Sequence, residues 1–244
     1  MVMIVGSVRE MFRYPVKSFA GERLESECNI EQYGLFGDRL HAFVDEKKEG
    51  WNSFITARGI PAMLNYRAII EENSFEEGEP CVVVTAPDGK QYRWDEELLQ
   101  EIQRLARVKI SMKKYKTGSG EGTGIDDSHI LIVTDRSLLH LEALWGKELD
   151  PRRFRANLIV SLNDQEGGEA EWIGKQLIIG SAEFRIDKGC ERCSMITLHP
   201  DSLERDSSLL KVVNNELQLT FGVYASVVRT GVIAIGDEVR MTNP

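Results

Sequence analysis

Two cysteines three positions apart carry the clearest chemical signal in this sequence. Cys190 and Cys193 enclose Glu191 and Arg192, so an arginine directly precedes the second thiol. A guanidinium beside a sulfur stabilises the thiolate, which is the form that binds a metal or attacks an electrophile. We therefore expect one of the two cysteines to be chemically active.

A cysteine pair at this spacing is compatible with three kinds of site. A zinc site commonly needs two such pairs, and neither Cys28, Cys81 nor the four histidines offer a second one at a matching spacing. A thioredoxin-like dithiol usually begins a helix, whereas residues 194–198 are β-prone, which weakens this interpretation without removing it. In the third, one thiolate binds a soft transition metal whose other ligands come from a cofactor. The third interpretation explains why the sequence offers few metal-binding side chains but many basic ones.

Basic and hydroxyl side chains lie at the ends of several predicted strands. Lys17 and Ser18 lie in a loop after the first predicted strand, and Arg39 lies in a loop bounded by glycines. Thr56 and Arg58 lie at the end of a short β-prone segment. The loops with Lys17 and Arg39 could supply cations and hydrogen-bond donors for an anionic ligand held against the sulfur. The alternatives are a solvated Lys17 side chain and a surface ion pair of Arg39 with Asp38.

The segment 150–158 adds further cations. If this segment is extended, Arg153, Arg155 and Asn157 share one face, because side chains of a strand alternate. That face would form an anion-binding wall, and a solvated basic patch is the alternative. Because the whole chain carries a net charge of -9, a cluster of basic residues indicates a local site.

Composition places the chain among soluble globular proteins. It has 244 residues, of which 42% are hydrophobic and 28% charged. The acidic balance argues against nucleic-acid or anionic-membrane partners. We see neither a signal sequence nor a run of about 18 apolar residues, so we expect a cytoplasmic protein without membrane association. Four cysteines, two of them paired beside an arginine, favour metal or redox chemistry over a disulfide framework.

The hydrophobic pattern predicts many strands and few helices. Helices are expected after Asp95 and from Thr134 to Gly146, whereas residues 200–216 are interpreted as a polar loop that covers the site. Strands are expected over residues 5–16, 24–30, 40–44, 53–57, 64–70, 81–85, 109–115, 130–133, 177–179, 182–186, 223–228 and 231–239. Because strands and helices do not alternate strictly, an α+β, β-barrel-rich fold is favoured over a doubly wound one.

A glycine-rich stretch at residues 118–124 divides the predicted elements. Its alternating glycines could cradle a phosphate, but no strand and helix frame them as a phosphate loop requires. A flexible connection is the better interpretation. We place the domain boundary here, which gives domains 1–117 and 118–244.

Several motifs in chain order resemble those of the MOSC family. They resemble most the branch with an N-terminal β-barrel domain, which includes the mitochondrial amidoxime-reducing component and its bacterial relatives. The motifs are Tyr14-Pro15-Val16-Lys17-Ser18, Gly37-Asp38-Arg39, Thr56-Ala57-Arg58, Phe154-Arg155-Ala156-Asn157, Cys190-Glu191-Arg192-Cys193 with Thr197 and Pro200-Asp201, and a closing Gly-x-x-x-x-Gly-Asp at 231–237. His199 and Ala156 depart from the residues usual at their positions, which bears on loop geometry and substrate access. The resemblance implies a MOSC fold with an N-terminal β-barrel-like domain and a few flanking helices.

The resemblance also implies a molybdenum cofactor, a pyranopterin dithiolene with a terminal phosphate whose metal binds one protein cysteine. In this branch the ligand corresponds to Cys193. The residues that correspond to cofactor contacts are Lys17, Ser18, Arg39, Thr56, Arg58, Thr134, Arg153, Arg155, Asn157, Glu191 and Arg192.

The activity implied is reduction of N-hydroxylated compounds, such as amidoximes, hydroxylamines and N-hydroxylated bases. The sequence contains no iron–sulfur spacing of cysteines, so electrons are expected from a separate flavin, haem or iron–sulfur protein. One alternative is a protein that carries the molybdenum cofactor, or its sulfur, without turnover. Another is pyridoxal-phosphate chemistry with Lys17 as the Schiff-base amine.

Overall fold

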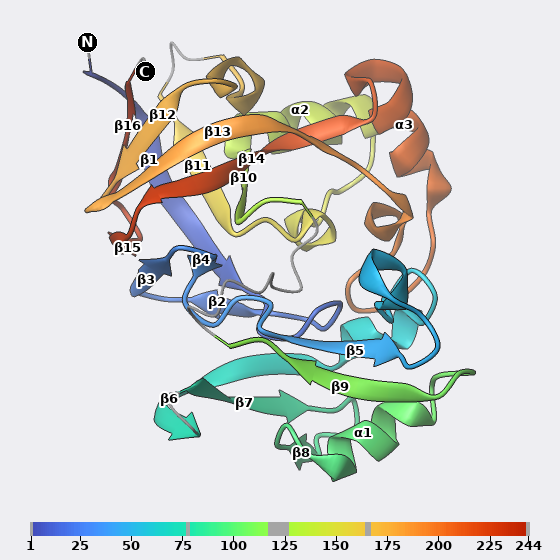
Figure 1. The fold of residues 1–244 in the computed structure, drawn as a ribbon. Helices are drawn as coiled ribbons and strands as arrows, with labels where there is room; N and C mark the ends of the chain where they lie inside the picture. The colour runs from blue at the N-terminus through green and yellow to red at the C-terminus, as the bar shows by residue number, and fades with distance from the viewer. Residues whose placement is uncertain (1, 77–78, 117–126, 164–166, 243–244) are drawn as a thin grey trace.

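The computed structural model describes residues 2–76, 79–116, 127–163 and 167–242. Within these residues, seven strands form a closed barrel (Figure 1). They are β1 (Val2–Arg13), β10 (Ile130–Thr134), β11 (Leu158–Leu162), β12 (Gln176–Ile179), β13 (Ala182–Glu191), β14 (Thr220–Arg229) and β16 (Glu238–Thr242). The spatial order is β11-β10-β14-β13-β12-β16-β1, and pairing of β1 with β11 closes the barrel.

The first strand joins the two halves of the sequence. β1 is antiparallel to β11, with Met11 opposite Leu158, and antiparallel to β16, with Val2 opposite Thr242. Met11 is fully buried in the barrel core together with Phe184. Strand pairing therefore crosses the predicted boundary after residue 117, while the glycine-rich stretch 118–124 lies outside the described residues.

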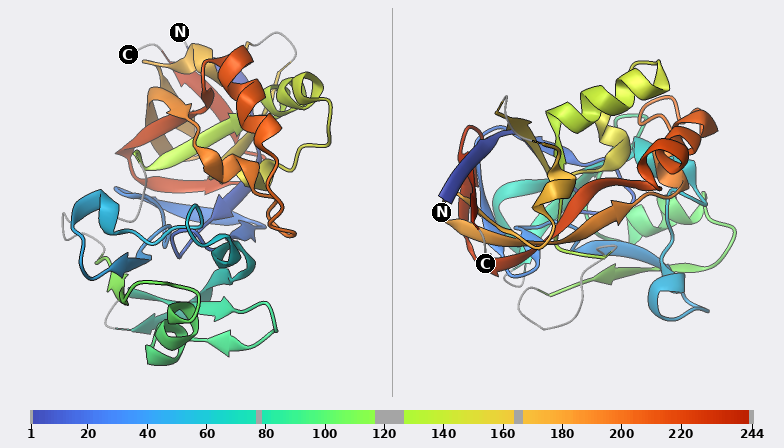
Figure 2. Two further views of the ribbon diagram at one scale, coloured as in Figure 1. Left: turned by 90° about the vertical axis from the view of Figure 1, so that its right-hand side faces the viewer. Right: turned by 90° about the horizontal axis from the view of Figure 1, so that it is seen from above.

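Three smaller sheets lie beside the barrel, two of them forming the lower part of the molecule (Figures 1 and 2). The strands are β3 (Glu27–Glu31), β4 (Gly34–Leu35) and β15 (Gly231–Ala234) in one sheet, β5 (His41–Asp45) and β9 (Ile110–Lys114) in another, and β6 (Arg67–Glu76), β7 (Glu79–Thr85) and β8 (Gln91–Tyr92) in the third. A short strand, β2 (Glu22–Leu24), pairs with β1. Phe19, Phe43 and Met63 belong to the core beneath the barrel.

The three α-helices of the described residues begin at capping side chains. They are α1 (Glu96–Gln103), α2 (Asp135–Trp145) and α3 (Ser207–Leu217). Asp95, Thr134 and Asp206 accept hydrogen bonds from backbone N–H groups of the first turns, and α2 ends at Gly146 with φ of 71°. Helices α2 and α3 pack together on one side of the barrel (Figure 2). No helix among the described residues combines the length and apolar content needed to cross a membrane.

The α+β, barrel-rich fold class is confirmed, but some local predictions were wrong. Residues 207–217 form helix α3, because Asp206 caps its first turn and Leu209 and Val213, four positions apart, are buried together. The strand predicted over residues 53–57 is absent, and residues 50–53 form a 3₁₀ turn. The strand predicted over residues 64–70 begins later, because residues 61–65 form another 3₁₀ turn before β6 begins. The β-prone stretch after Cys193 is also a 3₁₀ turn, Ser194–Thr197.

The predicted extended segment 150–158 is a turn as well. Pro151–Phe154 form a 3₁₀ helix, and Arg155 adopts a left-handed conformation with φ of 55°. The Asp150 carboxylate accepts a hydrogen bond from the Arg152 N–H at 2.9 Å, and Pro151 fixes the φ angle of the first turn. These local interactions outweigh the alternating pattern on which the strand prediction depended.

His41, at the start of β5, is a buried histidine that responds to acid. The residue is 1% exposed, and its ring packs edge-on against Trp94, with ring centroids 4.7 Å apart. Burial, with a smaller effect of the Lys114 charge, lowers the pKa of His41 to about 3. An unfolded histidine takes up its proton at a higher pH, so the folded state loses stability as pH falls from about 6.5 toward 3.

We predict that His41→Phe reduces the acid sensitivity of the fold. The free energy of unfolding should decrease between about pH 7 and about pH 5 in both proteins, and the decrease should be roughly 2 kcal/mol smaller in the variant. This difference follows from a loss of ~1.4 kcal/mol per pH unit below the pKa of the unfolded histidine. Urea unfolding at the two pH values measures this difference. His140→Phe, on the exposed face of α2, is the matched control. An identical pH dependence in His41→Phe and the parent contradicts the prediction.

Candidate functional site

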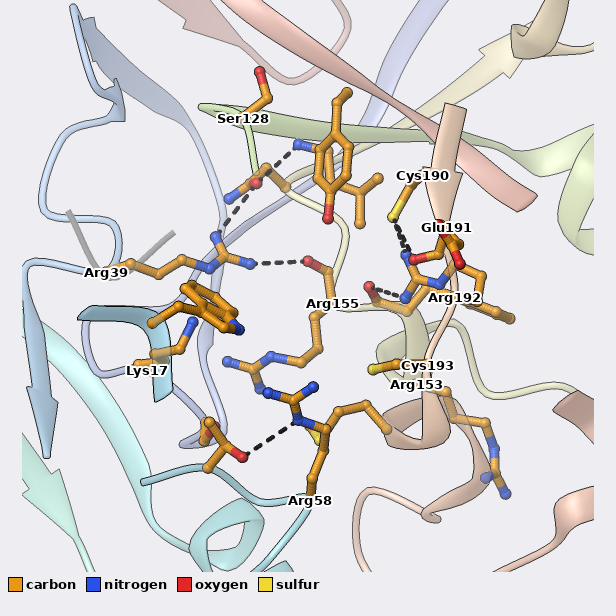
Figure 3. A pocket seen from close by; sticks show the side chains of 18 residues that line it. Lys17, Arg39, Arg58, Ser128, Arg153, Arg155, Cys190, Glu191, Arg192 and Cys193 are labelled. Carbon is orange, nitrogen blue, oxygen red and sulfur yellow. Dashed lines mark hydrogen bonds between the residues drawn. The ribbon is translucent and has the colours of Figure 1, made fainter. Parts of the chain in front are cut away.

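A pocket lies where residues 17–58 meet the barrel, and Cys193 lies in its lining (Figure 3). It encloses about 830 Å³, a volume that includes space open to solvent. The lining residues are Lys17, Ser18, Arg39, Trp51, Thr56, Arg58, Ser128, Leu131, Arg153, Phe154, Arg155, Asn157, Cys190, Glu191, Arg192, Cys193, Met195 and Tyr224. All the predicted site residues except Thr134 are thus brought together.

The pocket is strongly basic. Its lining contains Lys17 and five arginines against one carboxylate, that of Glu191. Figure 3 shows the side-chain ends of Lys17, Arg58 and Arg155 gathered to one side of Cys193. The Cys193 side chain is exposed, whereas Cys190 is 1% exposed. An accessible sulfur therefore shares a cavity with several cations, which is an environment for an anionic ligand.

The backbone is unusual at three lining residues. Ser18, Arg39 and Arg155 adopt positive φ angles of 69°, 52° and 55°. Non-glycine residues in this region cost on the order of 1–3 kcal/mol each and cluster at functional sites. Backbone hydrogen bonds hold two of them: Arg39 N–H donates to the Tyr14 carbonyl at 2.8 Å, and Arg155 N–H to the Arg152 carbonyl at 3.1 Å. The tight turns aim both arginines into the pocket.

Arg39 and Arg155 are held by the same neighbours. Arg39 forms an ion pair with the buried Asp38 and donates through Nη2 to the Arg155 carbonyl at 3.2 Å. The two guanidinium carbons lie 4.8 Å and 4.3 Å from the centre of the Tyr14 ring. Burial raises the pKa of Tyr14 to about 12, so its hydroxyl keeps its proton and donates to the Ala156 carbonyl at 3.3 Å. These two arginines are therefore held in place before any ligand binds.

Asn157 connects three strands behind these arginines. Its Oδ1 accepts from the Leu131 N–H at 3.1 Å and from Arg39 Nη1 at 3.4 Å, and its Nδ2 donates to the Phe12 carbonyl at 3.2 Å. The residue is 1% exposed. Its amide thus ties β1 to β10 next to the start of β11.

The ammonium group of Lys17 packs against two aromatic rings. Its Nζ lies 4.3 Å from the centre of the Trp51 ring and 4.9 Å from that of Phe54, and the residue is 5% exposed. Contacts of this kind with a desolvated ammonium are worth roughly 0.5–2 kcal/mol. The aromatic rings therefore hold the ammonium group against the pocket.

The predicted common face of Arg153, Arg155 and Asn157 is wrong, because the turn at residues 151–155 separates the two arginines. Arg153 donates to the Ile196 carbonyl at 3.1 Å, and its guanidinium carbon lies 5.6 Å from the Trp145 ring centre. In Figure 3 the Arg153 guanidinium points away from Cys193. Burial lowers the pKa of Arg153.

Arg192 contacts the first cysteine of the pair. Its Nη1 donates to Cys190 Sγ at 2.7 Å, and its Nη2 donates to the Phe154 carbonyl at 2.8 Å. The guanidinium therefore lies beside the first thiol, although Arg192 directly precedes Cys193 in the sequence. Arg192 instead anchors the segment that carries Cys193, and its backbone N–H donates to the Leu219 carbonyl at 2.8 Å.

Thr134 lies outside the pocket lining. Its hydroxyl accepts from the Ser137 N–H at 3.2 Å as the cap of α2, and donates to Glu169 Oε2 at 2.5 Å. Burial raises the pKa of Glu169. In this structure Thr134 begins a helix and binds a buried carboxyl group.

Protein groups alone do not form a metal site in the part of the chain that the structure describes. No cluster of three or more His, Cys, Asp or Glu side chains there has a metal-binding arrangement. Cys28 and Cys81 are buried, and burial raises the pKa of the Cys28 thiol to about 11.

The fold agrees with comparisons to known proteins. The MOSC domain model matches residues 119–240, and the MOSC N-terminal beta barrel domain model matches residues 5–122. The chain belongs to the MOSC family, as the motif resemblance predicted.

The similarity to individual known proteins covers different shares of this chain. Human mitochondrial amidoxime reducing component 2 is 26% identical over 96% of this chain and 83% of the relative. Molybdenum cofactor sulfurase of Anopheles gambiae is 29% identical over 50% of this chain and 14% of the relative. The crystal structure of the YUAD protein from Bacillus subtilis covers 100% of this chain and 98% of its own, with a TM-score of 0.53 and 13% identity. This last similarity concerns the fold.

We predict that Asn157→Ala destabilises the folded chain by about 2–4 kcal/mol, because the Leu131 N–H and the Phe12 carbonyl each lose a buried partner. Urea unfolding monitored by circular dichroism measures the loss. Asn214→Ala, on the exposed side of α3, is the matched control and should change stability by less than about 0.5 kcal/mol. Equal stability of the two variants contradicts the role given to Asn157.

Proposed function

We propose that the pocket binds the pyranopterin form of molybdenum cofactor and that Cys193 Sγ is its protein ligand. The observation that carries the proposal is an exposed thiol in a pocket lined by Lys17 and five arginines with one carboxylate. A soft thiolate suits a transition metal, and a phosphorylated, anionic cofactor suits the cations. The donor set of the pocket therefore fits this group.

Lys17, Arg39, Arg58 and Arg155 are the residues that would hold the phosphate and the pterin. Each charge-assisted hydrogen bond to such a group contributes about 1.5–3 kcal/mol. Because Tyr14 and the neighbouring carbonyl groups already fix the orientation of two of these arginines, little side-chain entropy is lost on binding. Arg58 is exposed, and its Nε lies 3.5 Å from Thr56 Oγ1.

The reaction proposed is the reduction of N-hydroxylated compounds, such as amidoximes, hydroxylamines or N-hydroxylated bases. The N–O bond breaks, and two electrons with two protons leave the oxygen as water. When bound, the cofactor supplies two-electron redox chemistry at molybdenum, and a separate flavin, haem or iron–sulfur protein supplies the electrons. Similarity to an amidoxime reducing component over 96% of this chain supports this activity.

A carrier of the cofactor, or of its sulfur, is the second candidate. Its support is the similarity of half of this chain to molybdenum cofactor sulfurase. A carrier would use the same pocket and the same sulfur, so turnover is the property that separates the two functions.

We predict that Cys193→Ala folds normally but contains no molybdenum after expression in a host that makes the cofactor, because the metal loses its protein ligand. Metal analysis and pterin fluorescence measure the content, and circular dichroism measures the fold. Cys190→Ser is the matched control and should retain most of the metal. A full complement of molybdenum in Cys193→Ala contradicts the assignment, and equal loss of activity in both variants favours a dithiol mechanism.

We also predict that molybdenum-loaded protein reduces benzamidoxime to benzamidine when a chemically reduced viologen dye supplies electrons. Product formation, measured by chromatography, should be absent from Cys193→Ala. Fully loaded protein that transfers its cofactor to another apoenzyme but reduces no N-hydroxylated compound contradicts the reductase and supports the carrier.

A further inference from the structure

Trp51 is an exposed aromatic side chain within an otherwise basic pocket. It is 43% exposed and contributes to the pocket lining from the same region of the chain as Thr56 and Arg58. The other lining aromatic residues of the described chain, Phe154 and Tyr224, are buried and partly buried. Trp51 therefore offers the most accessible aromatic surface of this pocket.

The indole ring is held in place before any ligand binds. It meets the Phe54 ring edge-on, with centroids 5.3 Å apart and planes at 66°, and the Lys17 ammonium lies 4.3 Å from its centre. The turn that carries it begins at Gly50, whose φ of 60° suits glycine. A ring that is both fixed and exposed binds a flat ligand with little loss of conformational freedom.

The position of Trp51 distinguishes it from other exposed apolar residues. Single exposed side chains such as Leu139, 67% exposed on α2, are ordinary on a protein surface. Trp51 instead shares a cavity with Cys193, the residue to which the proposed function assigns the metal. Specific sites combine such apolar surfaces with a few polar groups that orient the ligand.

We propose that Trp51 forms one wall of the substrate subsite and selects N-hydroxylated groups conjugated to a flat ring, such as arylamidoximes and N-hydroxylated bases. This inference rests on the proposed function. The ring of the substrate packs against the indole, while its N–O group is directed toward the side of the pocket that carries Cys193. An aliphatic amidoxime has the same reacting group but gains nothing from the indole.

A pair of substrates tests the proposal. Benzamidoxime carries a phenyl group where acetamidoxime carries a methyl group. Reduction of each compound by molybdenum-loaded protein is assayed with a viologen dye as electron donor. Trp51→Ala should raise KM for benzamidoxime roughly three- to tenfold and leave KM for acetamidoxime within about twofold, as expected from the loss of one aromatic contact. Trp51→Phe should restore most of the difference. Leu139→Ala is the control and should change neither value.

Binding gives a second readout that does not depend on turnover. Benzamidine, the product, should change the tryptophan fluorescence of the loaded parent and not that of Trp51→Phe, whose other three tryptophans lie outside the pocket lining. Equal KM changes for the two amidoximes overturn the inference while leaving the reductase intact. Loss of molybdenum from Trp51→Ala also overturns it, since the indole then supports cofactor binding, directly or through Lys17. A loaded parent that reduces neither amidoxime overturns the proposed function and this inference together.

Discussion

The concentration of positive charge in one pocket is the constraint on which the rest of this structure depends. A chain of net charge -9 places Lys17 and five arginines around one cavity. Mutual repulsion of these cations opposes folding unless other groups offset it. Aromatic rings do so in part, because Tyr14 lies beneath two guanidinium groups and Trp51 beneath the Lys17 ammonium. An anionic ligand is the group that would complete the balance, which is why we interpret the pocket as a cofactor site.

The register between β1 and β11 builds this pocket. Met11 lies opposite Leu158, and the Phe12 N–H donates to the Asn157 carbonyl at 2.8 Å. This pairing places the chain that leaves β1 next to the chain that enters β11. As a result, Tyr14 and the loop with Lys17 meet Arg155, although Lys17 and Arg155 are 138 positions apart in the sequence. Closure of the barrel between β1 and β11 therefore brings the two halves of the pocket together.

Hydrophobic patterns and capping residues predicted much of the fold. Helix α2 between Thr134 and Gly146 has both end signals, and the motif loops at Lys17 and Arg39 were placed at the pocket. The sequence could not show that Arg153 turns away, since a 3₁₀ turn and a left-handed residue replaced the expected strand. Nor did it show the contact between Arg192 and Cys190, or the exposure of Trp51. Arg192 and Cys190 are only two positions apart, but the Phe154 carbonyl, far along the chain, also holds the Arg192 guanidinium, and Lys17 packs on Trp51. No local pattern records these distant neighbours.

The measurement that tests the central claim most directly is X-ray diffraction from crystals of loaded protein at wavelengths on either side of the molybdenum absorption edge. The anomalous difference map locates the metal independently of any assumption about the ligand. We predict one strong peak within bonding distance of Cys193 Sγ, in the pocket bordered by Lys17, Arg58 and Arg155. A peak elsewhere on the molecule, or at the Cys190 sulfur, would contradict it.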